Sequence, residues 1–202
     1  MKQLLITIAA VVLVGCGNPE ADRALVQAAR YGDVEAIKKH WAAGANVNAI
    51  GEFRKACPLY MAAYSYDAEA TKLLIENGAD IYQLDFENET ALHTAAYHSY
   101  HGEGDVSVVS LLVDHGSKIN AISDRGVTPL DWAMMFGVPE VADLLRKHGG
   151  KTSEELRRQE EAEESIHAAA RYGNIEAVKQ HLAAGTDVNA KGVFPNAGRT
   201  AL

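Results

Sequence analysis

Hydrophobic positions along the chain form short stretches with helical spacing. Between residues 106 and 113 the apolar side chains recur at intervals that place them on one helical face: Val106, Val109, Leu112 and Val113. Other stretches carry adjacent alanines, which let neighbouring helices approach closely, at 62–63, 95–96 and 169–170. Glycine follows several of these segments and ends a helix in a left-handed turn at little cost, as at Gly32, Gly137 and Gly173. The pattern predicts pairs of short helices joined by tight turns.

The predicted helix pairs recur at a regular period. A glycine after each second helix occurs at steps of 34, 38, 33 and 36 residues: Gly44, Gly78, Gly116, Gly149 and Gly185. A second landmark begins each first helix, at Cys57, Thr90 and Thr128, and returns at Thr200. Residues 28–49 and 169–190 are identical at 15 of 22 positions. A period near 33 residues indicates an array of stacked repeats.

These landmarks resemble the ankyrin repeat. The resemblance rests on "TALHTAA" from Thr90, "VVSLLVDHG" from Val108 and "AAGANVNA" from Ala42, and it covers nearly everything from about residue 22 onward. It implies an all-α fold, an ankyrin-repeat solenoid of stacked helix-turn-helix units with projecting β-hairpin loops. One such unit cannot bury its own apolar face, so stability comes from stacking.

The landmarks divide the chain into five segments. We expect a cleaved lipoprotein signal peptide at 1–15, a lipidated tether at 16–21 and an array of four repeats at 22–150. Residues 151–164 carry six Glu and two Arg without a wide apolar stripe, which predicts a charged helical spacer that Ser153 caps. Residues 165–202 begin a second, truncated array, because both arrays start with "AARYG". At least about three repeats are needed for stability, so we do not expect this segment to fold alone.

Several positions depart from the repeat pattern or support it. Thr90 and Thr128 are predicted to cap the helices that follow them. Tyr66 stands where the turn glycine is expected, so this turn must be strained or reshaped. Asn88 and Lys55 replace a loop glycine, and asparagine tolerates a positive φ better than most residues. An insertion of five residues within 97–103 explains the longest step between repeats.

The amino-terminal sequence has the pattern of a targeting signal. Lys2 precedes an apolar run of eleven residues at 4–14, about half the roughly 20 needed to span a bilayer. The run ends in Leu13-Val14-Gly15-Cys16, which resembles a bacterial lipobox. That resemblance implies cleavage before Cys16 and acylation of its thiol and amino group, with stable anchoring by more than one acyl chain. The alternative is a plain secretory signal with an incidental cysteine.

The resemblance to lipoproteins also predicts location. We expect the protein in the bacterial cell envelope, attached by lipid alone and facing the periplasm, in the outer rather than the inner membrane because Gly17 follows the cysteine. Cys57 is then left without an intramolecular partner, and we expect it to be a small buried apolar residue rather than a nucleophile.

Composition and motifs argue against two function classes. The formal net charge is −8, whereas affinity for nucleic acid comes largely from Lys and Arg. No catalytic motif or cofactor fingerprint is found, so we expect neither an enzyme nor a bound cofactor. Histidines recur one repeat apart, at His40, His115, His148 and His181, and such residues do not converge on one metal. His93 and His167 occupy a slot where ankyrin histidines bridge repeats.

The remaining hypothesis is a surface that binds another protein, displayed by a monomer. In ankyrin repeats the loop tips and the exposed end of the first helix usually contact the partner. Transferred to this chain, those positions are Arg30, Tyr31, Phe53, Arg54, Tyr64, Ser65, Phe86, Glu87, Glu89, Tyr97, His98, Tyr100, Asp124, Arg125, Met135 and Phe136. Many are aromatic, and such side chains give a large contact area for few rotatable bonds. Tyr100, in the insertion, is the strongest candidate for contact.

Two alternatives stay open. Residues 98–105 contain His98, His101, Glu103 and Asp105, which are ligand types that zinc accepts, so this loop is a candidate for capture of a metal or small ligand. A passive spacer that holds something away from the membrane is the other alternative.

Overall fold

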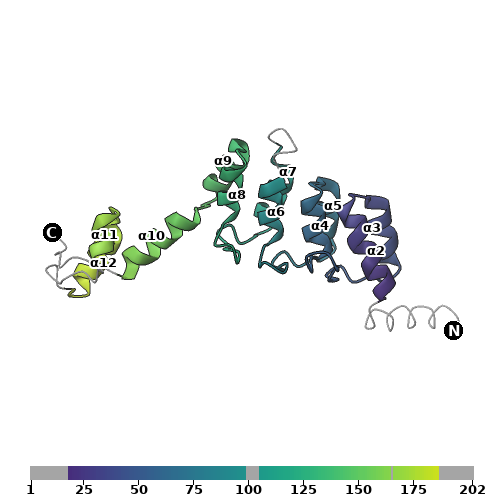
Figure 1. Cartoon of the computed structure of the whole chain (residues 1–202), viewed down its shortest axis with the longest axis horizontal. Coiled ribbons are helices and arrows are strands. Elements are labelled where there is room, and N and C mark those ends of the chain that lie inside the picture. The colour runs from purple at the N-terminus through teal and green to yellow at the C-terminus, as the bar shows by residue number, and fades with distance from the viewer. Residues whose placement is uncertain (1–17, 99–104, 165, 187–202) are drawn as a thin grey trace. The chain divides into compact units, whose positions relative to one another are not determined.

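The computed structural model describes residues 18–98, 105–164 and 166–186, which fall into two units, Met1–Lys151 and Thr152–Leu202. Every regular element in this part of the chain is a helix (Figure 1). The first unit contains α2 (Pro19–Arg30), α3 (Val34–Ala42), α4 (Pro58–Tyr64), α5 (Ala68–Glu76), α6 (Ala91–His98), α7 (Ser107–Asp114), α8 (Pro129–Met135) and α9 (Pro139–Lys147). The second contains α10 (Ser153–Glu164), α11 (Ile166–Arg171) and α12 (Ile175–Ala183).

The first unit is a stack of four helix pairs. The first helices α2, α4, α6 and α8 contact one another in chain order, and the second helices α3, α5 and α7 form a parallel row behind them. This arrangement confirms the predicted all-helical solenoid. Between the pairs, the described loops make tight turns with single closing hydrogen bonds and contain no regular strand, as between the Asp85 nitrogen and the Glu89 oxygen at 3.0 Å. They resemble hairpins in path without forming a strand ladder.

Local signals set where each helix begins. Asp33 and Asp67 accept a hydrogen bond from a backbone N–H in the first turn of α3 and α5, at 2.9 and 2.7 Å. Thr128 forms a reciprocal capping box with Asp131 at the start of α8, as its predicted capping role requires. The Cys57 sulfur accepts from the first turn of α4, and its side chain is buried, as expected.

Positive φ values occur where the sequence pattern requires them, even without glycine. Tyr66 has a φ of 56° in the slot of the turn glycine, and Lys55 and Asn88 have values of 51° and 56°. A left-handed residue with a Cβ costs about 1–2 kcal/mol. At Tyr66 the side chain offsets part of that cost, because its hydroxyl donates to the Asp105 carbonyl. The turn at Tyr66 therefore keeps the left-handed conformation of the glycine turns, with part of its backbone strain remaining.

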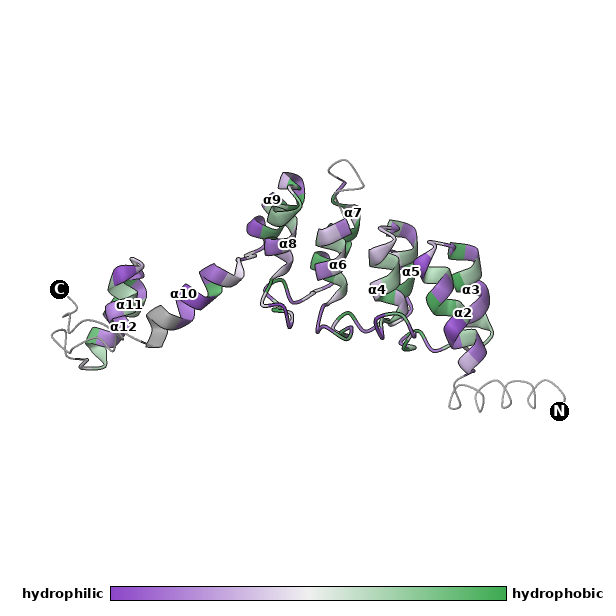
Figure 2. Ribbon diagram, viewed as in Figure 1, coloured by the Kyte–Doolittle hydropathy of each residue, from purple (hydrophilic) through white to green (hydrophobic). Residues whose placement is uncertain are grey.

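The core of the first unit is built from large aliphatic residues, at least one on every helix, with alanines between. The leucines of the four first helices are fully buried and occupy equivalent positions: Leu25, Leu59, Leu92 and Leu130. The second helices contribute Ile37, Leu74, Leu112 and Leu145. Alanines with no exposed surface, such as Ala62 and Ala95, lie between the first helices and keep them close. Figure 2 shows the apolar residues distributed over every helix pair.

A repeated side-chain contact joins each loop to the next repeat. In three successive loops the side chain four residues after the glycine donates to the backbone oxygen of the next repeat's glycine: Asn48 to Gly78, Tyr82 to Gly116 and Asn120 to Gly149. Tyr82 performs with its hydroxyl what asparagine performs elsewhere. The register between neighbouring repeats is thus fixed by specific hydrogen bonds as well as by apolar packing.

The second unit contains a helix of mainly polar residues and one helix pair. Thr152, rather than the expected Ser153, caps α10, because its hydroxyl accepts from the Glu155 nitrogen while the Glu155 carboxylate accepts from the Thr152 nitrogen. The described side chains of α10 include Glu154, paired with Arg157 and Arg158, and the helix is largely purple in Figure 2.

The helix pair α11–α12 repeats the sequence of α2–α3 but not its burial. Ala29 has no exposed surface, whereas its counterpart Ala170 is exposed. Ile37 is 2% exposed, and its counterpart Val178 is only partly buried. In α2–α3 these positions pack against α4–α5, so the difference marks the face on which a following repeat would stack. Residues 187–202, the rest of the predicted second array, lie outside the described residues.

No helix in the described ranges has the length and apolar character needed to cross a membrane. The predicted signal peptide and Cys16 lie outside these ranges.

Candidate functional site

Aromatic side chains from three repeats form a continuous chain of ring contacts. Phe53 packs edge-on against Tyr64 with ring centroids 6.2 Å apart, and Tyr64 lies 4.2 Å from His98. Tyr97 contacts His98, Trp132 and Phe136 at 4.5, 5.5 and 4.4 Å. We call Phe53, Tyr64, Tyr97, His98, Trp132 and Phe136 the aromatic run. Arg30 extends it at one end, with its guanidinium 4.6 Å from the Phe53 ring centre.

The repeat geometry explains why these rings meet. Tyr64 and the pair Tyr97–His98 are the last residues of α4 and α6, and Phe136 directly follows α8. The ends of the first helices of stacked repeats lie side by side, so a ring there can reach a ring at the helix end of the next repeat, as Tyr64 reaches His98 and Tyr97 reaches Phe136. Edge-to-face contacts of this kind contribute about 0.5–1.5 kcal/mol each beyond the area that they bury. The run is therefore held in place by its own contacts.

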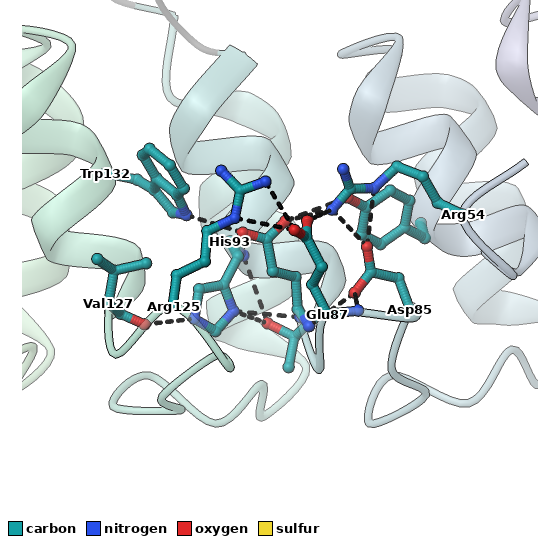
Figure 3. Close-up of polar contacts among 10 residues, drawn as sticks. Arg54, Asp85, Glu87, His93, Arg125, Val127 and Trp132 are labelled. Carbon is teal, nitrogen blue, oxygen red and sulfur yellow. Dashed lines mark hydrogen bonds and ion pairs between the residues drawn. The ribbon is translucent and has the colours of Figure 1, made fainter.

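Next to the aromatic run, five charged side chains from three loops form a cluster. Arg54 pairs with Asp85, Glu87 and Glu89, and Arg125 pairs with Glu87. Figure 3 shows the two arginines on either side of Glu87. We call these residues the carboxylate–arginine cluster. Backbone bonds hold the loops together at the same place, from the Phe86 nitrogen to the Arg54 oxygen and from the Asp124 nitrogen to the Glu87 oxygen, both at 2.9 Å.

Glu89 links the cluster to the aromatic run. One carboxylate oxygen accepts from Arg54 at 3.0 Å and from the Tyr60 hydroxyl at 3.4 Å, and the other accepts from the Trp132 indole N–H at 3.2 Å. Its side chain is only 8% exposed. Charge, ring and backbone contacts thus cross-link three repeats within one site.

Burial and hydrogen bonding shift the pKa values of the two glutamates in opposite directions. Hydrogen bonds from Arg125, and then from Arg54, hold the pKa of the Glu87 carboxyl below its usual range. At Glu89 burial raises the pKa, and the charge of Arg54 offsets only part of that effect. Burial of the ionised Glu89 carboxylate therefore costs free energy, and its three hydrogen-bond donors reduce that cost.

A cavity of about 270 Å³ lies between the aromatic run and the cluster. Its lining comes from both: Phe53, Arg54, Tyr60, Tyr64, Glu89, Thr94, Tyr97, His98, Arg125 and Trp132. The cavity is a hollow of mixed character, with aromatic walls and a polar floor.

Most of the predicted contact residues converge on this site. Six of them lie in or beside the aromatic run: Arg30, Phe53, Tyr64, Tyr97, His98 and Phe136. Five lie in or beside the carboxylate–arginine cluster: Arg54, Phe86, Glu87, Glu89 and Arg125. The Phe86 ring centre lies 4.8 Å from the Arg54 guanidinium. Tyr31 and Met135 are 76% and 64% exposed without a ring contact to the run among the described residues. Asp124 accepts from the Asn88 amide at 2.8 Å. Cys16 and Tyr100 lie outside the described residues.

Three residues that complete the site were not predicted as contact residues from the sequence: Tyr60, Asp85 and Trp132. The three acids at 85, 87 and 89 were a usable signal, because the tight turn closed by the hydrogen bond from the Asp85 nitrogen to the Glu89 oxygen keeps them close together. Trp132 occupies a first-helix position where the pattern places a core side chain, and it is indeed buried while its N–H reaches Glu89.

In the described part of the chain, Asp85, Glu87 and Glu89 lie close enough together to share a metal ion, because their carboxylate oxygens are within 4.8 Å of one another. Arg54 already pairs with all three carboxylates and neutralises part of their charge. In the insertion considered for metal capture, residues 99–104 lie outside the described ranges. At its described ends, His98 packs against Tyr64 and Tyr97, and Asp105 accepts from the start of α7.

His93 has a structural role rather than a chemical one. Its Nδ1 lies 2.8 Å from the Thr90 hydroxyl, and its Nε2 donates to the Val127 oxygen of the next repeat at 3.2 Å (Figure 3). Burial lowers the pKa of this imidazole, so the neutral form is favoured. The expected bridge between repeats is confirmed at this position.

Stacked helix pairs, loop-to-loop hydrogen bonds and a buried bridging histidine define a solenoid repeat protein. The model for ankyrin repeats (3 copies) matches residues 25–122. Human ankyrin repeat domain-containing protein 37 is 33% identical over 113 residues, which are 56% of this chain and 68% of that protein. The bovine protein of the same name is 32% identical over the same share. The chain belongs to the ankyrin-repeat family, whose repeats support protein–protein interaction.

Another similarity is confined to part of a much longer protein. The mitochondrial liver isoform of glutaminase from Rattus norvegicus is 38% identical over 92 residues, which are 45% of this chain but 14% of that protein. The mouse protein matches over the same shares. The match covers only the ankyrin region of that enzyme, and proteins of the ankyrin-repeat family are generally non-enzymatic.

Proposed function

We propose that this chain is a non-enzymatic, lipid-anchored protein of the bacterial cell envelope, and that its first unit binds another protein through the aromatic run. The observation that carries the proposal is the run itself, which joins three repeats around one cavity. Phe53 and Phe136 remain 40% and 37% exposed despite their ring contacts. Exposed apolar side chains that belong to one contiguous patch often mark a site of contact with another protein.

Rigidity supports binding at this place. Association costs free energy for every side chain that must be ordered, about 0.5–1.5 kcal/mol for each flexible one. In the aromatic run and the carboxylate–arginine cluster, the ring contacts and ion pairs have already ordered the side chains. Tyrosine, tryptophan and arginine are also the residue types that contribute most to binding energy in protein interfaces.

The anchoring part of the proposal rests on the sequence around Cys16. Replacement of this residue by alanine is expected to abolish incorporation of labelled palmitate and to release the protein from the membrane fraction. Incorporation that persists in the Cys16→Ala variant contradicts lipidation there. If the segment is a plain secretory signal, neither the unaltered protein nor the Cys16→Ala variant incorporates palmitate, and both are released from the membrane fraction.

Partner binding is tested by removal of ring contacts. Affinity capture from crosslinked envelopes compares the unaltered protein with a Tyr64→Ser, Tyr97→Ser variant and with a Trp41→Ser variant as control. Trp41 is 48% exposed on α3 and lies outside the aromatic run. We expect a particular protein to be lost by about tenfold or more from the double variant alone, since two interface anchors contribute well over 1.4 kcal/mol together.

Circular dichroism controls for folding of each variant. Equal recovery of the same protein by the folded double variant and by the control contradicts binding through the aromatic run. That result favours the passive spacer, in which the repeats only provide length.

A further inference from the structure

The three carboxylates of the carboxylate–arginine cluster already accept three hydrogen bonds each, so most of their acceptor sites are used within the protein. One Asp85 oxygen accepts from the backbone nitrogens of Glu87 and Glu89, both at 2.8 Å, and the other accepts from Arg54 at 2.8 Å. Glu87 accepts from Arg54 with one oxygen and from Arg125 with the other, at 3.0 and 2.7 Å. Glu89 accepts from three side chains.

The two arginines, in contrast, keep donors for a ligand. Each uses Nε and Nη2 for the carboxylates, and the Nη1 group of each has no hydrogen-bond partner within residues 18–98, 105–164 and 166–186. Both side chains line the cavity, with 22% of Arg54 and 51% of Arg125 exposed. In Figure 3 one nitrogen of each guanidinium has no dashed line. The polar side of the cavity therefore offers donors to hydrogen-bond acceptors of whatever fills it.

Size and walls restrict what fills the cavity. Sites for small molecules and cofactors are usually about 300–1,000 Å³, so a cavity of about 270 Å³ is small for them but has room for one large side chain. Tyr64, Tyr97 and Trp132 supply walls whose edges and faces suit an aromatic ring. An aromatic side chain is therefore the best match to the apolar part.

Charge then decides between a carboxylate and a neutral acceptor. The carboxylate–arginine cluster has three acids against two arginines, and the whole chain has a formal net charge of −8. A partner segment that brings another carboxylate meets this excess of negative charge. Backbone carbonyl oxygens accept hydrogen bonds without adding charge.

We infer that the cavity is an anchor site for one aromatic side chain on an uncharged or basic segment of the partner protein. The backbone carbonyl oxygens beside that residue accept from Nη1 of Arg54 and Arg125. This inference rests on the proposed function and names the part of the partner that the aromatic run contacts.

Capped amino acids test the inference without knowledge of the partner. N-acetyl-phenylalaninamide carries one aromatic ring and two amide carbonyls, N-acetyl-leucinamide lacks the ring, and N-acetylphenylalanine carries a free carboxylate. Each is titrated into the ¹⁵N-labelled full chain. The chain has two tryptophans, so the spectrum contains two indole N–H signals, which a Trp41→Phe variant assigns. Trp132 reports on the cavity, and Trp41, outside its lining, is the internal control.

We expect the aromatic amide to shift the Trp132 signal saturably and to leave Trp41 unchanged. It should bind at least about threefold more tightly than the leucine amide, because of the ring contacts. The free acid should bind no more tightly than the aromatic amide. Failure of the aromatic amide to saturate, a preference for leucine, equal shifts of both indoles, or tighter binding of the acid overturns the inference.

Matched variants test the role of Arg125. Arg125→Lys keeps the positive charge but removes Nη1, and Arg125→Gln removes both; each is expected to weaken binding of the aromatic amide by about fivefold or more. Lys72→Gln, on the exposed side of α5, is the control and should change nothing. Unchanged binding in both Arg125 variants contradicts the inference. If capped amino acids fail while partner capture still depends on Tyr64 and Tyr97, this inference is wrong and the proposed function stands.

Discussion

Replacement of Arg54 by alanine is expected to cause a large loss of stability in the first unit. Arg54 is the common partner of Asp85, Glu87 and Glu89, whose ligand atoms lie within 4.8 Å of one another. Without the guanidinium, three negative charges remain close together, and two of them are nearly inaccessible to water, with Asp85 0% and Glu89 8% exposed. The loss includes the cation contact to the Phe86 ring.

The magnitude follows from burial. Removal of one partner of a buried ion pair costs about 3–5 kcal/mol, and Arg54 is 22% exposed, so we expect the lower end, about 3 kcal/mol. The pair between Arg23 and Glu52 provides the contrast, because its side chains are 69% and 82% exposed. Exposed pairs of that kind contribute about 0–1 kcal/mol. Arg23→Ala is thus a matched control in the same unit.

Urea denaturation followed by circular dichroism at pH 7 measures both variants. We expect Arg54→Ala to lower the free energy of unfolding by about 3 kcal/mol and Arg23→Ala by less than about 1 kcal/mol. The difference between Arg54→Ala and the unaltered protein should shrink below about pH 5, as the carboxylates take up protons and stop repelling one another. The triple change Asp85→Asn, Glu87→Gln, Glu89→Gln in the Arg54→Ala background should recover much of the loss.

Two results refute this reasoning. If Arg54→Ala and Arg23→Ala have equal effects, the cluster behaves as a solvated surface pair and burial does not govern it. A loss that is as large at pH 4 as at pH 7 means that packing of the Arg54 stem, rather than charge, is responsible.

Three further predictions concern stability. Burial raises the pKa of the Glu89 carboxyl in the folded protein, so its contribution to the free energy of unfolding is present at low pH and is lost as pH rises through the folded pKa. On acidification the native protein should therefore gain stability relative to a Glu89→Gln variant. Urea titrations of both proteins at pH 5 and pH 7 measure this difference. Gly32→Ala should lower the free energy of unfolding by about 2–3 kcal/mol, because φ is 65° and the new Cβ would lie 2.6 Å from the Asp67 carboxylate that caps α5. Gly137→Ala has a similar φ of 67° but open space around the new Cβ, so it should lower the free energy of unfolding by about 1 kcal/mol in the same assay. His93→Ala should cost about 2–3 kcal/mol, because two buried hydrogen-bonding groups lose their partner, and a thermal melt that matches the native protein contradicts its bridging role.

The sequence predicted the repeat architecture well because its signals are local. Thr128 caps α8, Gly32 and Gly137 have the positive φ expected of them, and His93 bridges to the next repeat. Each of these depends on a few neighbouring residues or on a fixed offset of one repeat. Helix positions and stacking follow from such signals without knowledge of the loops.

Part of the contact surface was also predicted from the repeat pattern. The ends of the first helices lie side by side in stacked repeats, which is why Tyr64 contacts His98 and Tyr97 contacts Phe136. Their partner Trp132 was not selected, because a buried position hides a side chain whose N–H nevertheless reaches Glu89.

The pairing of Arg54 with the three carboxylates could not be predicted from spacing. Arg54 contacts residues 31 to 35 positions away, and it does so from a backbone with a φ of 55°, which a sequence pattern does not indicate for arginine. The capping of α10 by Thr152 instead of Ser153 shows the same limit on a smaller scale. Both residues are suitable caps, and the loop path decides which one is used.

Site-specific photo-crosslinking in intact cells tests the central claim most directly, namely that the aromatic run binds a protein. A benzophenone amino acid replaces Phe53, which is 40% exposed, or Lys72 on α5 as the control. We expect one protein to be crosslinked from position 53 at a yield several times that from position 72, and to be lost when Tyr64 and Tyr97 are replaced by serine. Absence of any adduct at position 53, or the same adducts from both positions, would contradict the account.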